Sequence, residues 1–374
     1  MARRVVIDGT PLLRQGPPDG IARVTHGLIK AMASVQHEFE IVIFGRRLRG
    51  EWLGKLLPGS KTIHLRFPRW RSCEWLVEKA RLTEMLCRAD LYHATANVMP
   101  IGRSARTVVT LHDVLFLVYP EKWLGHDELA RRIPAFARRC RAIITASEHS
   151  KQDIATHVGV APERIHVIPW GVDRDLFRPA DGAEGVRERL SRDLGLRRPY
   201  FVSVSCDIGR KNMPRLLQVY ARLADGGAHN DLVLVWANPP PEILDRFCRG
   251  PISERIHFLG SQSNEGLRDL YCGATALVYP SIYEGFGLPI LEAMSCGTPV
   301  VTSNVTSMPE VGGDAAIYVD PLDDDSILRA LARFEDEPAL AAQLREKGLR
   351  QAAKFSWERC ARETLGVYRR CLEM

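Results

Sequence analysis

Residues 281–294 read SIYEGFGLPILEAM, and this stretch decides the predicted fold. The apolar run just before it predicts a buried strand, which ends at Pro280. The two glycines, Gly285 and Gly287, predict a tight turn in which the backbone can approach a ligand closely. A helix then opens at Leu288, because the proline that follows suits the first helical turn. The stretch therefore predicts a strand, a glycine turn and a helix in that order.

A helix start of this kind is a site for an anion. The free N–H groups near Leu288 lie at the positive end of the predicted helix dipole, where phosphate is the usual occupant. Glu284 precedes the helix and Glu292 lies within it, ~12 Å apart at a helical rise. The carboxylates of a glycoside hydrolase lie about 5–9.5 Å apart, so this spacing argues against hydrolysis. We interpret the two carboxylates as acceptors for different hydroxyls of one long ligand. The alternative is that Glu292 only complements the dipole and Glu284 is solvated.

Two further predicted strands end in polar residues. Arg210 and Lys211 lie between the strand at 201–204 and the next helix. Two adjacent cations suit a diphosphate, because its departing charge needs fixed positive partners in the transition state. His112 follows the strand at 108–111, and nothing in the sequence makes it a general base. The alternative for each residue is an ordinary solvated or structural side chain.

Length, composition and charge argue against several classes of protein. The 374 residues predict two domains, and 45% hydrophobic residues are ordinary for a globular protein. No apolar run reaches the ~18 residues of a membrane span, and the first residues indicate a strand rather than a signal peptide. The nine cysteines are scattered without CxxC or zinc spacing, which indicates reduced thiols and a cytoplasmic location. The net charge of +6 fits ligands that carry phosphate, while no aromatic-basic pattern predicts nucleic-acid binding.

Short apolar strands alternate with helical patterns along the chain, in two sets. This alternation predicts an α/β protein of two doubly wound parallel sheets, with ligand sites at the carboxyl ends of the strands. The Pro- and Gly-rich segment near 168–179 predicts the hinge between the domains. Residues 46–75 combine basic and aromatic side chains, so we consider a membrane or acceptor surface there, with a solvated surface as the alternative. The predicted strands are residues 5–7, 41–44, 91–93, 108–111 and 143–145 in the first set, and 201–204, 232–235, 256–258, 276–279 and 300–301 in the second.

The stretch at 281–294 resembles the E-x7-E motif of retaining glycosyltransferases of the GT-B fold, family 4, and the likeness continues through residues 296–301 and 308–311. The resemblance implies two Rossmann-like domains that face a central cleft. It places the acceptor side in residues 1–178, the nucleotide-sugar side in 179–355, and a helix that crosses back in 356–374. It implies catalytic roles for His112, Lys211 and Glu284. The residues that it implies for donor binding are Gly20, Arg210, Lys211, Leu259, Glu284, Gly285, Phe286, Gly287, Leu288 and Glu292.

The resemblance also implies a reaction: transfer of a hexose from a nucleotide-diphosphate sugar to a hydroxyl of a glycan or lipid-linked saccharide. The Arg-Lys-Asn form at 210–212 resembles bacterial mannosyltransferases of surface-polysaccharide assembly, such as lipopolysaccharide, which suggests GDP-mannose or a GDP-deoxyhexose. A UDP-sugar donor is the first alternative, and a non-catalytic nucleotide-sugar binder or a GT-B phosphorylase ranks lower. No DxD set follows a strand, so we expect transfer without a metal or other cofactor. Peripheral contact with the cytoplasmic membrane face is part of the hypothesis for residues 46–75.

Overall fold

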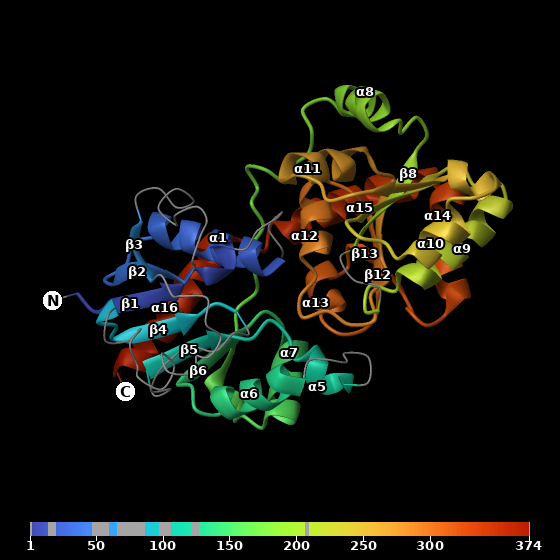
Figure 1. The fold of residues 1–374 in the computed structure, drawn as a ribbon. Helices are drawn as coiled ribbons and strands as arrows, with labels where there is room; N and C mark the ends of the chain where they lie inside the picture. Colours follow the sequence, from blue (N-terminus) through green and yellow to red (C-terminus); the bar gives the residue numbers. More distant parts are fainter. Residues whose placement is uncertain are drawn as a thin grey trace. The chain divides into compact units, whose positions relative to one another are not determined.

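The computed structural model describes residues 2–13, 20–46, 60–65, 87–96, 106–120, 127–205 and 209–373. Most of the basic and aromatic segment at 46–75 lies outside these ranges, so the membrane hypothesis stays a prediction. The chain divides into two compact units (Figure 1). Unit 1 comprises Met1–Gly171 and Ser356–Met374, and unit 2 comprises Val172–Phe355. The first unit therefore ends at Gly171 before the chain enters the second unit, whereas the sequence analysis places this boundary after residue 178.

Unit 1 is built on a seven-stranded sheet in the order β3-β2-β1-β4-β5-β6-β7. All of its strand pairs are parallel. The predicted strands are present, and the sequence missed the two at the edges, β3 and β7. The elements are β1 Arg4–Asp8, η1 Thr10–Leu13, α1 Gly20–Ser34, β2 Glu40–Arg46, β3 Lys61–Leu65, β4 Leu91–Ala94, β5 Thr107–Thr110, α5 Leu115–Val118, α6 Asp127–Ala137, β6 Ala142–Thr145, α7 Glu148–Asp153, η4 Ile154–Val158, η5 Pro162–Arg164, β7 Ile165–Val167 and α16 Trp357–Glu373.

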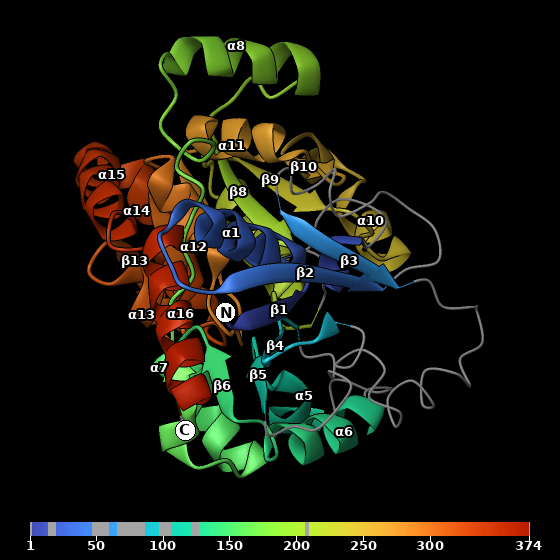
Figure 2. The same ribbon diagram turned by 90° about the vertical axis from the view of Figure 1, so that its left-hand side faces the viewer.

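Helices cover both faces of this sheet, because alternate residues of a parallel strand face opposite sides. On one face, Val6 and Val109 pack into a buried cluster with side chains of α5, α6 and η4. On the other face lie α1 and α16, which pack against each other (Figure 2). Gly27 of α1 lets the two helices approach, since a Cβ there would lie 2.4 Å from the Trp357 ring. The last helix of the chain therefore completes the first unit.

Unit 2 repeats the plan with a six-stranded parallel sheet in the order β10-β9-β8-β11-β12-β13. The five predicted strands are present and β13 is the one that the sequence missed. In each sheet the order reverses beside the first strand, at β1/β4 and at β8/β11, which is where such sheets bind ligands. The elements are α8 Ala183–Leu194, β8 Tyr200–Ser205, α9 Met213–Asp225, β9 Asp231–Trp236, α10 Pro241–Phe247, η6 Pro251–Glu254, β10 Ile256–Leu259, α11 Asn264–Gly273, β11 Ala276–Tyr279, α12 Leu288–Ser295, β12 Val300–Ser303, α13 Met308–Gly312, β13 Ala316–Val319, α14 Asp324–Asp336 and α15 Pro338–Ala352.

The core of unit 2 is densely apolar around its central strands. All six residues of β9 are buried, as expected for a strand covered on both faces. One face packs against α9, α10 and α14 through residues such as Leu216 and Leu331. Helix α12 packs against both α11 and α15. This packing positions α12 between two neighbouring helices of the unit. Among the described residues, no helix combines the length and apolar character of a membrane span.

Candidate functional site

The turn between β11 and α12 has the form that the sequence predicts. Strand β11 ends at Tyr279 and α12 begins at Leu288, with Gly287 as the N-cap residue. Gly287 has φ +108°, a left-handed conformation that suits glycine and few other residues. The Ser307 hydroxyl lies 2.8 Å from the carbonyl oxygen of Glu284 and 2.9 Å from that of Phe286, so it holds both ends of the turn.

A second loop is hydrogen-bonded to this turn. It joins β8 to α9 and carries Arg210 and Lys211, followed by Asn212 at the N-cap of α9. The backbone N–H of Ile282 donates to the Arg210 carbonyl at 2.7 Å. The Asn212 side-chain amide donates to the Pro280 carbonyl at 3.2 Å. These bonds join the carboxyl ends of two adjacent strands, so the cations lie beside the glutamate turn.

The two loops bring three charges into contact. Glu284 Oε2 lies 2.8 Å from Arg210 Nη1, and Glu284 Oε1 lies 2.7 Å from Lys211 Nζ. The Lys211 amino group also donates to the Tyr279 hydroxyl. Lys211 and Glu284 are 6% and 5% exposed, so these charges are largely removed from water. Among the described residues, both cations therefore contact the same carboxylate.

The neighbouring cations set the ionisation of Glu284. Burial is the largest influence and raises the pKa of this carboxyl, but the positive charges of Arg210 and Lys211 outweigh it and hold the pKa at about 2. Glu284 is therefore ionised at neutral pH.

Glu292 lies on α12, and its side chain is buried with it. The residue is 3% exposed. The Tyr271 hydroxyl, from α11, donates to Glu292 Oε2 at 3.3 Å. The carboxylate is thus positioned by a neighbouring helix. Its assignment to the ribose of a nucleotide stays a prediction.

His112 belongs to unit 1 and follows β5, as the sequence predicts. Its Nε2 lies 2.9 Å from the carbonyl oxygen of Thr95. A carbonyl only accepts hydrogen bonds, so Nε2 carries a proton and donates it to Thr95. The ring also lies 5.7 Å from that of Trp170.

The other predicted residues are spread over several elements. Gly20 begins α1 in unit 1 and is exposed, with no heavy atom within 4 Å of an added Cβ. Leu259 ends β10, and the Phe286 ring packs edge-on against Phe355 with centroids 5.9 Å apart. Gly285 lies in the turn before α12. Within unit 2, the structure brings Arg210, Lys211 and Glu284 into direct contact.

Sequence reasoning missed three residues that hydrogen-bond to Lys211, to Glu292 or to the turn before α12. The Tyr279 hydroxyl accepts a hydrogen bond from the Lys211 amino group, and the Tyr271 hydroxyl donates one to the Glu292 carboxylate. The Ser307 hydroxyl donates to the Glu284 carbonyl in the turn before α12. Tyr279 ends the strand that precedes the 281–294 motif. That position is the one signal in the sequence that could have identified Tyr279 as part of the site. Tyr271 and Ser307 are distant in the sequence from the carboxylates that they contact. No pattern along the chain points to either of them.

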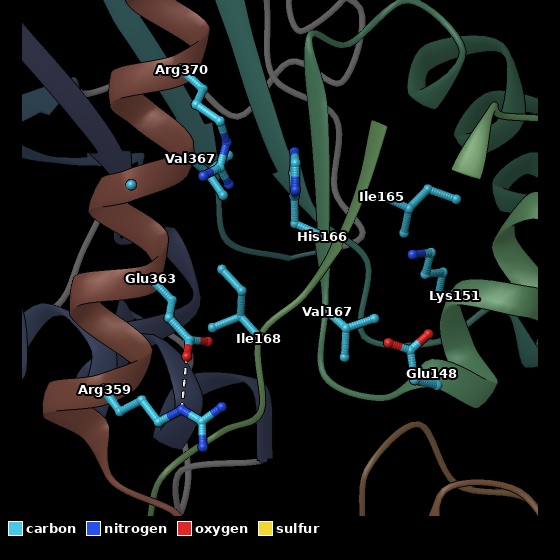
Figure 3. Close-up of a pocket in the computed structure, with 11 residues that line it drawn as sticks. Glu148, Lys151, Ile165, His166, Val167, Ile168, Arg359, Glu363, Val367 and Arg370 are labelled. Atoms are coloured by element: carbon cyan, nitrogen blue, oxygen red, sulfur yellow. Dashed lines mark hydrogen bonds and ion pairs between the residues drawn. The ribbon is translucent and has the colours of Figure 1, made fainter. Parts of the chain in front are cut away.

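Unit 1 also contains a groove that the sequence did not predict (Figure 3). Its volume is about 450 Å³, and α7, β7 and α16 line it with, among others, Lys151, His166 and Arg370. Arg359 and Glu363 form an ion pair of 2.7 Å in its wall. Burial, then the charges of Arg370 and Lys151, lower the pKa of His166. None of the predicted site residues lines this groove. Among the described residues, no group of three or more His, Cys, Asp or Glu is placed to hold a metal ion.

Two family models match the chain, one for each unit. The model described as Glycosyltransferase Family 4 matches residues 18–176, and that described as Glycosyl transferases group 1 matches residues 186–351. The second match contains the three contacting charges and Glu292.

Curated relatives that are similar to this chain include two mannosyltransferases. The MMP alpha-(1->4)-mannosyltransferase of Mycolicibacterium hassiacum is 35% identical over 257 residues, which are 67% of this chain and 58% of that protein. The O-antigen chain mannosyltransferase B of Escherichia coli is 33% identical over 285 residues, 75% of this chain and 74% of that protein. The alignment thus spans less than two thirds of the first relative and about three quarters of the second.

Solved structures show the same fold. WaaG, a glycosyltransferase involved in lipopolysaccharide biosynthesis, has a TM-score of 0.76 at 18% identity over 97% of this chain and 99% of that one. Anabaena HepE in complex with UDP and glucose has a TM-score of 0.77 at 17% identity over 98% and 99%. These values confirm the arrangement of two Rossmann-like units that the sequence predicts. At such low identity they concern the fold alone.

Proposed function

The chain belongs to glycosyltransferase family 4, and we propose that it is a retaining mannosyltransferase of surface-polysaccharide biosynthesis. In this proposal it moves mannose from GDP-mannose to a hydroxyl of a glycan or lipid-linked saccharide. The observation that carries the proposal is the buried contact of Arg210 and Lys211 with Glu284, next to the start of α12. The names of the aligned relatives supply the sugar and the polysaccharide context.

The charged group suits the departure of a nucleoside diphosphate. As the bond to the anomeric carbon breaks, negative charge grows on the diphosphate oxygens. Arg210, Lys211 and the N–H groups at the start of α12 are fixed positive partners for that charge. Fixed charges of this kind need no rearrangement at the moment of reaction.

The two glutamates and the histidine position the donor in this proposal. Glu284 accepts hydrogen bonds from sugar hydroxyls, and Glu292 accepts them from the ribose. His112 hydrogen-bonds the sugar and supports the developing charge at the anomeric carbon. A leaving phosphate oxygen takes the proton of the acceptor hydroxyl, so no protein base is required. The anomeric configuration is then retained.

We further propose that the reaction needs no metal ion and takes place in the cytoplasm. The positive charges of Arg210 and Lys211 supply the stabilisation that a divalent cation provides in other transferases. The cysteines of the described residues are all free, which fits a reducing compartment. Peripheral membrane contact through residues 46–75 remains part of the proposal, to be tested by flotation with anionic vesicles at low salt.

A donor panel tests the proposal. The protein is incubated with GDP-mannose, a GDP-deoxyhexose and UDP-glucose, each with and without EDTA, and with mannose-terminated oligosaccharides as acceptors. We expect release of GDP, transfer of mannose and an α-linked product by NMR, unchanged by EDTA. Release of UDP instead of GDP would move the assignment to UDP-sugars. Binding without transfer or hydrolysis across the panel would contradict an enzymatic function.

A second test compares the kcat of Lys211→Ala, which removes a buried cation, with that of Arg222→Ala as its control. Arg222 lies on α9 and forms an exposed ion pair with Asp325, so its loss leaves the charged group intact. We expect Lys211→Ala to lower kcat at least about 100-fold, the effect of removing one fixed group that stabilises transition-state charge. Arg222→Ala is expected to match the unaltered protein. Equal rates in both variants would remove the charged group from the mechanism.

A further inference from the structure

The groove in unit 1 runs along the open edge of its sheet (Figure 3). Among the described strands, β7 ends the sheet order and pairs with β6 alone. The Ile168 N–H donates to the Thr145 carbonyl, at the end of β6, over 2.8 Å. Backbone groups alternate in direction along a strand, so the N–H of Val167 points to the open edge instead. The groove therefore has a backbone donor on its floor, between walls formed by α7 and α16.

A glycine leaves space in the α16 wall of the groove. Gly366 lies in the interior of α16, where glycine is less favourable than alanine. Close packing does not account for it, because among the described residues an added Cβ would meet only Arg370 Nη1, at 3.9 Å. On Gly27, by contrast, an added Cβ would lie 2.4 Å from the Trp357 ring. The absence of a side chain at Gly366 therefore keeps the groove open beside the Arg370 guanidinium.

Charged side chains are sorted along the groove. In Figure 3, Arg370 and His166 lie toward its upper end and Lys151 lies across β7 from Arg370, whereas Glu148 and Glu363 lie toward its lower end. Within the described part of the chain, neither Lys151 nor Arg370 is in an ion pair. Burial, followed by the charges of Arg370 and Lys151, lowers the pKa of His166, so this ring is neutral at pH 7. One part of the groove is therefore cationic and the other carries carboxylates.

This sorting suits a small molecule with a phosphate group at one end and hydroxyls at the other. Lysine and arginine bind phosphate through charge-assisted hydrogen bonds. Carboxylates accept hydrogen bonds from hydroxyls, and the pairing of Glu363 with Arg359 does not exhaust its lone pairs. The apolar side chains of Ile168 and Val367 can pack against the C–H groups of a sugar ring. A volume of about 450 Å³ lies within the range of small-molecule sites.

We propose that the groove is a second ligand site, which binds the phosphate ester of a sugar or other polyol. Its phosphate lies at Lys151 and Arg370, and its hydroxyls at Glu148 and Glu363. The site goes beyond the proposed function, because it lies in unit 1 and the charged group lies in unit 2. Within unit 1, His112 follows β5, two strands and about 10 Å across the sheet from β7. Soluble sugar phosphates and phosphorylated inositol lipids both carry the required chemistry.

Titration calorimetry on the whole protein tests the soluble source, with glucose 6-phosphate as the probe and glucose and inorganic phosphate for comparison. We expect saturable binding of glucose 6-phosphate, weaker binding of inorganic phosphate and none of glucose. Lys151→Ala and Arg370→Ala should each weaken binding at least about tenfold, since each removes a charge-assisted hydrogen bond. Arg369→Ala is the matched control and should bind as the unaltered protein does. It removes a neighbouring charge of α16 that pairs with Glu38 on the surface.

The shape of the groove is tested without a change of charge. Gly366→Leu fills the space beside Arg370 and should weaken binding at least about tenfold, whereas Gly366→Ala adds one carbon at an ordinary contact distance and should not. Circular dichroism checks that both variants fold. Saturating GDP and Lys211→Ala should leave the binding of glucose 6-phosphate unchanged, because both concern unit 2. Displacement by GDP, or full affinity in Lys151→Ala or Gly366→Leu, would overturn the proposal.

Flotation tests the lipid source. Phosphatidylcholine vesicles with and without phosphatidylinositol 4-phosphate are mixed with the protein and with Lys151→Ala and Arg370→Ala. Flotation that requires the phosphorylated lipid and is lost in both variants would support the site and place its ligand on a membrane. Binding of glucose 6-phosphate without such flotation would support a soluble ligand. The site is refuted if glucose 6-phosphate does not bind and no flotation depends on Lys151 and Arg370.

Discussion

At the scale of single residues, the charged group is maintained by mutual compensation. Isolated charges as buried as Lys211 and Glu284 would be costly, because water no longer solvates them. The contacts of 2.7 and 2.8 Å to Glu284 offset that cost. Removing Glu284 takes away the carboxylate that both cations contact. The group is therefore sensitive to single substitutions in both stability and activity.

The first prediction concerns Glu284 and pH. Its pKa is about 2 in the folded chain, against an ordinary value of 4.5. A lowered carboxyl pKa contributes stability that is present above pH 4.5 and is lost as pH falls toward 2. The full shift corresponds to about 3 kcal/mol of unfolding free energy. We expect Glu284→Gln to lose this pH dependence, as measured by urea denaturation between pH 7 and pH 3.

Glu337→Gln is the matched control for that measurement. Glu337 pairs with Arg333 at 2.8 Å, but on an exposed surface. Exposed ion pairs contribute little, so this variant should follow the unaltered protein across the pH range. If Glu284→Gln kept the same acid sensitivity as the unaltered protein, the compensation described for Glu284 would be wrong.

The second prediction concerns His112. His112→Ala removes a group that contacts the sugar in the proposed function but leaves unit 2 untouched. We expect the GDP affinity to stay within about threefold while kcat falls about 100-fold, the scale for loss of one hydrogen-bonding group in a transition state. Steady-state rates and calorimetric GDP titration separate the two quantities.

His112→Gln extends the comparison, because the glutamine amide can also donate to the Thr95 carbonyl. It should recover part of the lost rate if His112 acts as a hydrogen-bonding group. Near-normal turnover in His112→Ala would exclude the assignment. A parallel loss of GDP binding would show that the variant disturbs more than the sugar contact.

At the scale of elements, the start of α12 depends on backbone geometry. The third prediction is that Gly287→Ala weakens both folding and phosphate binding. With φ +108° the backbone is strained for alanine, and the new Cβ would lie 3.1 Å from Ile290 Cδ1. We expect a loss of about 1–3 kcal/mol in unfolding free energy and weaker GDP binding. Denaturant unfolding and GDP titration measure the two effects.

Gly260→Ala is the control for the helix start. Gly260 lies in the same unit, its φ is not in the left-handed region, and no heavy atom lies within 4 Å of an added Cβ. This variant should unfold and bind as the unaltered protein does. Normal GDP binding by Gly287→Ala would show that the exact path of the turn is not needed by the phosphate.

At the scale of the whole molecule, the two units should respond to acid in different pH ranges. In unit 1, His93 is fully buried, with Nδ1 2.6 Å from the Tyr368 hydroxyl of α16 and Nε2 2.9 Å from the Thr110 hydroxyl. Burial, the largest influence, and the charge of His112 lower its pKa from 6.5 to about 3. The unfolded chain therefore takes up this proton at a higher pH than the folded chain does.

The fourth prediction follows from that difference. Unit 1 should lose stability as pH falls below 6.5, by about 2 kcal/mol at pH 5, whereas the Glu284 contribution in unit 2 persists down to pH 4.5. His166, whose pKa is also lowered, acts in the same direction. Urea denaturation from pH 7 to pH 4 should show the transition of unit 1 moving first.

His93→Gln should remove most of this acid sensitivity, although it lowers stability at pH 7. His157→Gln, which replaces an exposed histidine of η4, serves as the control and should retain it. Simultaneous movement of both transitions, or an unchanged slope in His93→Gln, would contradict the prediction.

The sequence by itself determined the class of fold and the start of α12. Apolar runs separated by helical patterns predicted two parallel sheets, since strands buried on both faces must be apolar throughout. The glycine turn and the proline after Leu288 predicted the helix that begins there. These inferences succeeded because strand burial, turn conformation and helix initiation depend mainly on neighbours along the chain.

Tertiary structure alone decided which side chains meet. Glu284 contacts Lys211 because β8 and β11 are adjacent in the sheet, an order that no local pattern specifies. The contact of the Tyr271 hydroxyl with Glu292 depends in the same way on how α11 packs against α12. Contacts between distant segments follow from the packing of whole elements, and so do the pKa values that those contacts set.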